Sequence, residues 1–213
     1  MAAALPSLAR WSASLLLVQS LAHAQSPVDC TPPANAKQLE TRLDQAKKDR
    51  IAGKRDAAAS TVDSILAVNP NYFRALYTKG LLLADEHNFT AAETPLQKAI
   101  EVQQKCASTP QFKSDYTVYN TLGWVQLVNG KPGKAEQSFN TALAHADQLS
   151  PASVARTKSN LGYLYFSNGE FSKAQPLLQQ AAAAGNANAA NTLNTLNQAQ
   201  QIYKESAAKQ AAK

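Results

Sequence analysis

The chain has 213 residues, of which 17% are charged and 7% are aromatic, and its formal net charge is +6. Alanine occurs 40 times, and it has the highest helix propensity of all residues. This composition predicts an all-α protein and argues against a β-sandwich, which needs many β-branched and aromatic residues. Two cysteines are too few for a disulfide-rich scaffold.

Residues 1–24 have the pattern of a secretory signal peptide. Arg10 precedes an apolar stretch, and the small residues Ala22 and Ala24 stand at the positions that a signal peptidase recognises. We therefore predict cleavage between Ala24 and Gln25, which places the mature chain in the periplasm or outside the cell. An uncleaved N-terminal anchor is the alternative. The apolar stretch is too short to span a bilayer, and no later segment is apolar enough to predict a membrane span.

The basic residues of the mature chain are scattered. Their one cluster, Lys47 to Arg55, is interleaved with Asp49. Such a pattern is typical of a solvated helix face rather than of a patch that binds nucleic acid or anionic lipid. We expect no nucleic-acid partner.

An extended leader, residues 25–36, precedes a repeated pattern over residues 37–184. A glycine is followed twelve residues later by an alanine and, four residues after that, by a bulky apolar residue. The three clear copies are Gly80, Ala92 and Leu96; Gly123, Ala135 and Phe139; and Gly162, Ala174 and Leu178. A weaker first copy has Ala46, Ala58 and Val62. The units span about residues 37–70, 71–106, 115–149 and 154–184.

Apolar residues recur within each half-unit at spacings of three, four and seven, so each half is predicted to be a helix with one buried face. We expect the glycine of the first helix to face the alanine of the second, because small residues allow two helices to approach to about 8–10 Å. Pro95 and Pro176 fall in second helices and are expected to bend them or to displace their starts.

This pattern resembles the tetratricopeptide repeat, a helix-turn-helix module. The resemblance implies a right-handed superhelical solenoid of about four helical hairpins with a concave groove. After residue 184, the apolar positions Leu193, Leu196 and Ile202 predict a last helix that caps the stack. Residues 185–213 are thus a capping helix with a tail, and the tail is expected to fray from Ser206 onward.

The resemblance also implies which side chains line the groove. They lie at fixed positions before and after the packing glycine of each first helix. The residues carried over are Arg74, Tyr77, Leu81, Asn120, Trp124, Arg156, Tyr163 and Phe166. Aromatic residues and arginine often dominate binding energy at interfaces. Trp124 and Tyr163, at equivalent positions, either bind a partner or simply fill space between neighbouring helices.

The two cysteines fall near one edge of the implied stack. Cys30 precedes the first helix, and Cys106 ends the second helix of the second unit. In an oxidising compartment, a disulfide between them is plausible. The alternative is two independent thiols.

Nothing in the sequence points to catalysis. No nucleophile motif and no phosphate-binding loop are present, and His87 and His145 are interpreted as surface residues rather than metal ligands. We therefore expect no enzyme activity, cofactor, metal or small-molecule substrate. The predicted function is an exported scaffold that binds a peptide or protein surface in its concave groove. The signal peptide together with the repeat predicts a role in bacterial envelope assembly. The alternatives are an accessory subunit of a secretion, pilus or polysaccharide-export machine, and a structural oligomer that stacks through its end caps.

Overall fold

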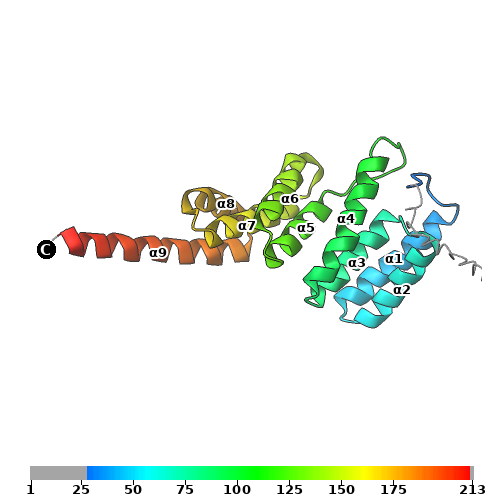
Figure 1. The fold of residues 1–213 in the computed structure, drawn as a ribbon, viewed down its shortest axis with the longest axis horizontal. Helices are drawn as coiled ribbons and strands as arrows, with labels where there is room; N and C mark the ends of the chain where they lie inside the picture. Colours follow the sequence, from blue (N-terminus) through cyan, green and yellow to red (C-terminus); the bar gives the residue numbers. More distant parts are fainter. Residues whose placement is uncertain (1–27, 212–213) are drawn as a thin grey trace, which may run out of the picture.

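The computed structural model describes residues 28–211, so the predicted signal peptide lies outside the described residues. Within that range, all regular structure is helical. Consecutive helices form hairpins that follow one another along the long axis of the molecule (Figure 1). The elements are α1 (Ala36–Ile51), α2 (Arg55–Val68), α3 (Phe73–Asp85), α4 (Phe89–Cys106), α5 (Thr117–Val128), α6 (Pro132–Ala144), the 3₁₀ helix η1 (Ala146–Gln148), α7 (Pro151–Ser167), α8 (Phe171–Ala183) and α9 (Ala187–Ala211).

The turn inside each hairpin follows one plan. Two residues beyond the first helix, the chain takes a left-handed backbone conformation, with φ of 76° at Gly53, 71° at Gly130 and 76° at Gly169. Glycine adopts this conformation at no steric cost because it has no Cβ. The second hairpin has His87 at the equivalent position, with φ of 59°. The sequence pattern located this turn but not the strained histidine in it.

Close packing inside the hairpins depends on the repeated glycines. A Cβ built on Gly80 would lie 2.5 Å from Leu96 Cγ, and one on Gly123 would lie 2.7 Å from Phe139 Cδ1. The glycines therefore face the bulky apolar residue of the second helix. Our expectation that they face the alanines is wrong, because the bulky side chain reaches across the hairpin to fill the space over the glycine. The alanines are fully buried nearby.

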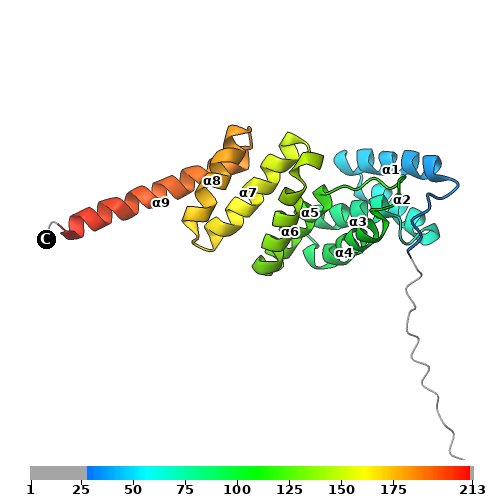
Figure 2. The same ribbon diagram turned by 90° about the horizontal axis from the view of Figure 1, so that it is seen from above.

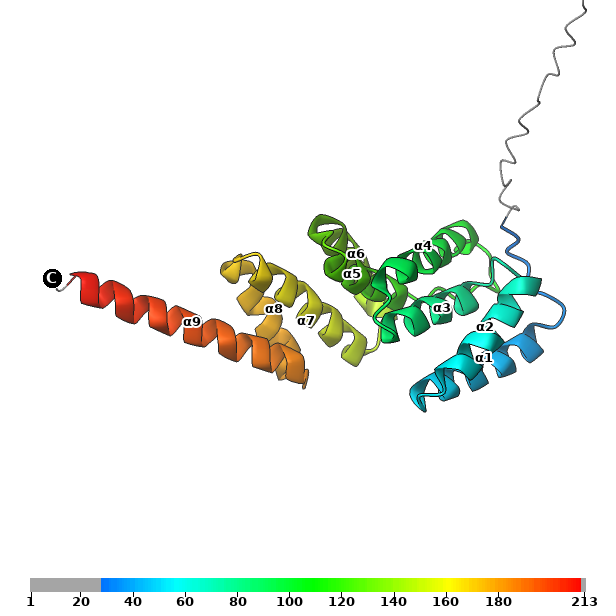
Figure 3. The ribbon, with the colours of Figure 1, turned by 60° about the horizontal axis from the view of Figure 1, so that its bottom comes forward.

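The helices form two layers. The odd-numbered helices contact one another in series from α1 to α9, and each even-numbered helix packs on its hairpin partner and on the next odd-numbered helix (Figures 2 and 3). The odd-numbered helices are thus the closely spaced layer, so they lie on the inside of the curve. We call the surface formed by α1, α3, α5 and α7 the inner face.

The apolar interior runs along the stack in three clusters. The first joins α1, α2 and α3, the second joins α3, α4, α5 and Ala142 of α6, and the third joins α6, α7, α8 and α9. Each cluster contains residues of two successive hairpins, and the third also includes α9. The hairpins are therefore stabilised mainly by their neighbours, as in other repeat proteins.

Both internal prolines lie within their helices. Pro95 is in α4 and Pro176 is in α8, and the two helices begin upstream at Phe89 and Phe171. The starts are therefore not displaced as we had allowed. A side-chain cap at α4, where Asn88 accepts a hydrogen bond from the Ala91 backbone N–H, satisfies part of the first turn.

The final helix, α9, packs on both α7 and α8, which is the relation that α7 has to α5 and α6. It begins with a side-chain hydrogen bond from the Ala189 N–H to Asn186 and then extends beyond the hairpins (Figure 1). The helix continues to Ala211, past Ser206, where we expected fraying. The segment is rich in Ala, Lys and Gln, whose helix propensity is high.

Candidate functional site on the inner face

Every side chain predicted to line the groove lies on an inner-layer helix. The structure divides them into two groups, those that join neighbouring repeats and those that remain open to solvent. By element they are Arg74, Tyr77 and Leu81 on α3, Asn120 and Trp124 on α5, and Arg156, Tyr163 and Phe166 on α7. The side chains that join neighbouring repeats lie mainly in the N-terminal half of the stack.

Charged side chains on the inner face of the first two repeats form ion pairs with one another. Arg74 Nη1 lies 2.8 Å from Glu40 Oε2, and Arg50 Nη1 lies 2.6 Å from Asp85 Oδ2. Tyr72 donates a hydrogen bond to the other oxygen of Glu40. Burial and the contact with Glu40 both raise the pKa of Tyr72, so its hydroxyl stays protonated and keeps donating. These charges already have partners within the chain.

Tyr77 connects two neighbouring inner helices and is not an open surface residue. Its hydroxyl lies 3.0 Å from Thr117 Oγ1 and 3.1 Å from Thr121 Oγ1, both on α5. Asn120 is similarly engaged, because Asn160 Nδ2 donates to its Oδ1 at 2.9 Å, and it is only 9% exposed. Tyr77 and Asn120 lie on inner helices, as the repeat pattern implies, but the pattern did not show that the next repeat contacts their polar groups.

The third and fourth repeats present an open group of aromatic side chains. The rings of Trp124 and Tyr163, on neighbouring inner helices, have centroids 6.1 Å apart. Tyr163 nevertheless remains 42% exposed. Phe166, one helical turn after Tyr163, contacts Phe171 at 5.8 Å, and Phe171 is 40% exposed. We call Trp124, Tyr163, Phe166 and Phe171 the aromatic patch.

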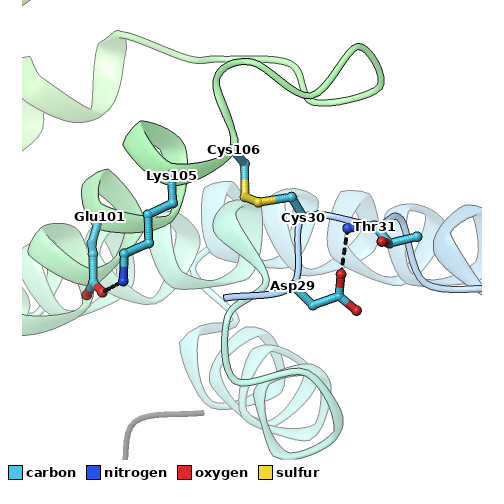
Figure 4. The surroundings of a disulfide bond; sticks show 6 residues. All are labelled: Asp29, Cys30, Thr31, Glu101, Lys105 and Cys106. Carbon is cyan, nitrogen blue, oxygen red and sulfur yellow. Dashed lines mark hydrogen bonds and ion pairs between the residues drawn. A yellow bond between two sulfur atoms is a disulfide. The ribbon is translucent and has the colours of Figure 1, made fainter. Parts of the chain in front are cut away.

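A pocket that the sequence did not predict lies beside the first two repeats. The leader crosses the end of α4, where Cys30 and Cys106 form a disulfide with a Cα–Cα distance of 5.3 Å (Figure 4). The leader, α1, the start of α3, the end of α4 and the loop after it enclose about 310 Å³. Phe73 and Phe112, whose ring centroids are 5.5 Å apart, are among its apolar walls. The positions of the two cysteines indicated that the leader lies near this edge of the stack. They did not predict the path of the leader over the end of α4.

Between residues 28 and 211, no group of three or more His, Cys, Asp or Glu is suited to hold a metal ion. His145 stacks on Tyr116 with ring centroids 3.7 Å apart, and His87 lies 5.9 Å from Phe89. None of the described helices combines the length and apolarity that crossing a membrane requires.

Stacked helical hairpins that each contact only their neighbours define a helical-repeat solenoid, the class of fold in which proteins present an extended inner face to partners. A profile of the tetratricopeptide repeat matches residues 43–108 and 120–189, together more than half of the chain. The protein belongs to the tetratricopeptide repeat family. The sequence-based predictions of this family and of an all-α solenoid are confirmed, and the fold is that of a protein-interaction scaffold.

Solved structures share this fold at low sequence identity. A crystal structure of MamA has a TM-score of 0.61 at 20% identity, over 79% of this chain and 86% of that one. MamA from Desulfovibrio magneticus RS-1 has a TM-score of 0.61 at 19% identity, over 80% and 89%. PilF from Pseudomonas aeruginosa has a TM-score of 0.65 at 15% identity, over 78% and 71%. A search of curated protein sequences finds no significant match.

The same fold also occurs inside an enzyme. An O-GlcNAc transferase mutant from Thermobaculum terrenum has a TM-score of 0.59 at 19% identity, over 72% of this chain but only 27% of the transferase. At these identities, each likeness concerns the fold alone. The likenesses therefore do not indicate which side chains bind a partner.

Proposed function

We propose that the mature chain is an exported, non-enzymatic scaffold that binds a peptide segment or protein surface through the aromatic patch, in the assembly of the bacterial envelope. The observation that carries this proposal is the mutually contacting pair Trp124 and Tyr163 on adjacent inner helices, in which Tyr163 is 42% exposed and Trp124 is partly buried. Aromatic side chains held rigidly by neighbours lose little entropy on binding, which is why they recur at interface hot spots.

Two observations support export. The first 24 residues have the signal-peptide pattern, and the disulfide between Cys30 and Cys106 is of a kind that persists in oxidising compartments. Export is tested by expressing the full chain in a bacterium, fractionating the cells and sequencing the N-terminus of the product. We expect periplasmic or secreted protein that begins at Gln25. Cytoplasmic protein that retains residues 1–24 contradicts this part of the proposal.

Binding is tested by affinity capture from an envelope extract with residues 25–213 as bait. The comparison is with the double variant Trp124→Ala/Tyr163→Ala and with the control Ile202→Ala/Tyr203→Ala, which removes exposed apolar side chains from α9 instead. All three baits must first show the same helical circular dichroism. We expect a partner that the wild type and the control retain and the aromatic variant loses.

Equal capture by the aromatic variant contradicts a role for the patch. Components of a pilus, secretion or polysaccharide-export machine among the partners lost by that variant identify the narrower function of an accessory subunit. Activity of such a machine, rather than of the isolated chain, is then the relevant assay.

A second candidate function rests on α9. Ile202 and Tyr203 are 68% and 75% exposed, which favours a structural oligomer that associates through this end. Light scattering of the wild type and of Ile202→Ser/Tyr203→Ser measures the mass in solution. A mass above that of one chain, reduced by the substitutions, supports the oligomer. A single-chain mass for both proteins rejects it.

A further inference from the structure

Arg156 on the inner face lacks the partner that its counterpart in the second repeat has. Arg156 on α7 stands six residues before Gly162, as Arg74 on α3 stands six residues before Gly80. Arg74 pairs with Glu40 at 2.8 Å, and the basic side chains Lys47 and Arg50, at other positions on α1, pair with Asp44 and Asp85 at 3.3 and 2.6 Å. Arg156 is exposed and makes no hydrogen bond or ion pair within residues 28–211.

The carboxylate of Asp115, which acts on Tyr77 as Arg156 does, is already engaged within the chain. Asp115 accepts hydrogen bonds from the Thr117 backbone N–H at 3.0 Å and from Thr117 Oγ1 at 2.5 Å, so its carboxylate serves the start of α5. Burial raises the pKa of Tyr77, Asp115 raises it further and the Arg156 guanidinium lowers it. The positive charge of Arg156 therefore acts on the Tyr77 hydroxyl, which connects α3 and α5 on the inner face.

Arg156 and Tyr163 of the aromatic patch share one side of α7. Tyr163 follows Arg156 by seven residues, which is two helical turns and about 10.5 Å along the axis. An extended chain advances about 3.3 Å per residue, so three residues cover the same distance. A guanidinium binds a carboxylate through paired, charge-assisted hydrogen bonds, and the aromatic rings offer an apolar surface at the other end.

We propose that Arg156 and the aromatic patch together bind an extended peptide in which an acidic side chain lies three residues from a bulky apolar one. This inference rests on the proposed function and specifies the partner of the same site. Arg156 holds the acidic side chain, and Trp124 with Tyr163 holds the apolar one. The pairing of the other three cations within the chain confines the acidic position to the end of the site near Arg156.

The test is a selection from a random-peptide display library against residues 25–213. It is run in parallel on the wild type, on the double variant Trp124→Ala/Tyr163→Ala, on Arg156→Glu, and on Arg55→Glu, a matched charge reversal at an exposed position of the outer helix α2. The wild type and Arg55→Glu should enrich Asp or Glu three residues from Trp, Phe or Leu. Arg156→Glu should enrich Lys or Arg at that acidic position. A synthetic peptide of the enriched sequence should bind the wild type about tenfold more weakly when its acidic residue is replaced by alanine.

The outcomes separate the two proposals. Enriched peptides that need Trp124 and Tyr163 but show no acidic preference, show it at another spacing, or are unchanged by Arg156→Glu, overturn this inference and leave the proposed function standing. If no peptide is enriched in a manner that depends on Trp124 and Tyr163, the peptide-binding function itself fails, and this inference fails with it.

Discussion

Replacing Gly80 by alanine adds one methyl group where two helices are in closest contact. An ideal Cβ there lies 2.5 Å from both Cγ and Cδ2 of Leu96, well inside van der Waals contact. Leu96 is fully buried, and its branching carbon cannot move without the rest of the side chain. Overpacking of this kind costs about 1–3 kcal/mol. Alanine gains about 1 kcal/mol over glycine in a helix interior, so we expect a net loss of up to about 2 kcal/mol.

Gly133 provides the matched control for this substitution. It also lies in a helix, α6, but a Cβ there has no atom within 4 Å. Gly133→Ala should therefore stabilise the protein by a few tenths of a kcal/mol up to about 1 kcal/mol, through helix propensity alone. Urea unfolding followed by circular dichroism measures both variants, and Gly80→Ala is measured again in a Leu96→Ala background. There the added methyl group should cost almost nothing, because its obstacle is gone. The packing argument is refuted if Gly80→Ala is as stable as Gly133→Ala.

Three further perturbations test the turn, the leader and an ion pair between repeats. His87→Gly should stabilise the protein by about 1 kcal/mol in the same urea assay, because φ of 59° strains any residue with a Cβ; a loss of stability contradicts this. Cys106→Ser should destabilise the first two repeats by about 4 kcal/mol, since the disulfide spans 76 residues, and Cys30→Ser should match it; hydrogen exchange resolved by segment measures both. Glu93 is buried, which opposes ionisation, but hydrogen bonds from Lys131 and Asn129 outweigh burial and hold its pKa below the ordinary 4.5. The stabilisation from ionised Glu93 is fully present at pH values above 4.5 and is lost as the pH falls through the lowered pKa. The difference in unfolding free energy between the wild type and Lys131→Met should therefore be largest near neutral pH and shrink in acid.

The sequence pattern predicted the hairpins because their defining contacts are local. A glycine, an alanine and a bulky residue at constant spacing fix two helices against each other within one unit. The same pattern did not indicate which residue covers the glycine, and Leu96 rather than Ala92 does so at Gly80. Spacing along the chain gives the face of a helix, but side-chain length decides which of two neighbours reaches across.

Contacts between repeats were less accessible to prediction. The concave position of Tyr77 follows from the repeat, yet its burial depends on Thr117 and Thr121, which stand on another helix after a loop of irregular length. The path of the leader over the end of α4 has no repeating pattern at all. The pocket beneath the leader therefore could not be predicted, even though Cys30 and Cys106 were recognised as a possible pair.

The two halves of the inner face differ for one physical reason. In the first two repeats, arginine and tyrosine at inner positions satisfy carboxylates and hydroxyls of a neighbouring helix, as Arg50 does with Asp85. In the last two repeats, inner positions hold large aromatic rings and Arg156, which the neighbouring helix leaves partly exposed. A side chain that already has its hydrogen bonds gains little from a partner, whereas an exposed ring or an unpaired guanidinium gains both burial and a hydrogen bond. Binding free energy is therefore expected to concentrate at α5 and α7, and the N-terminal half to act chiefly as their rigid support.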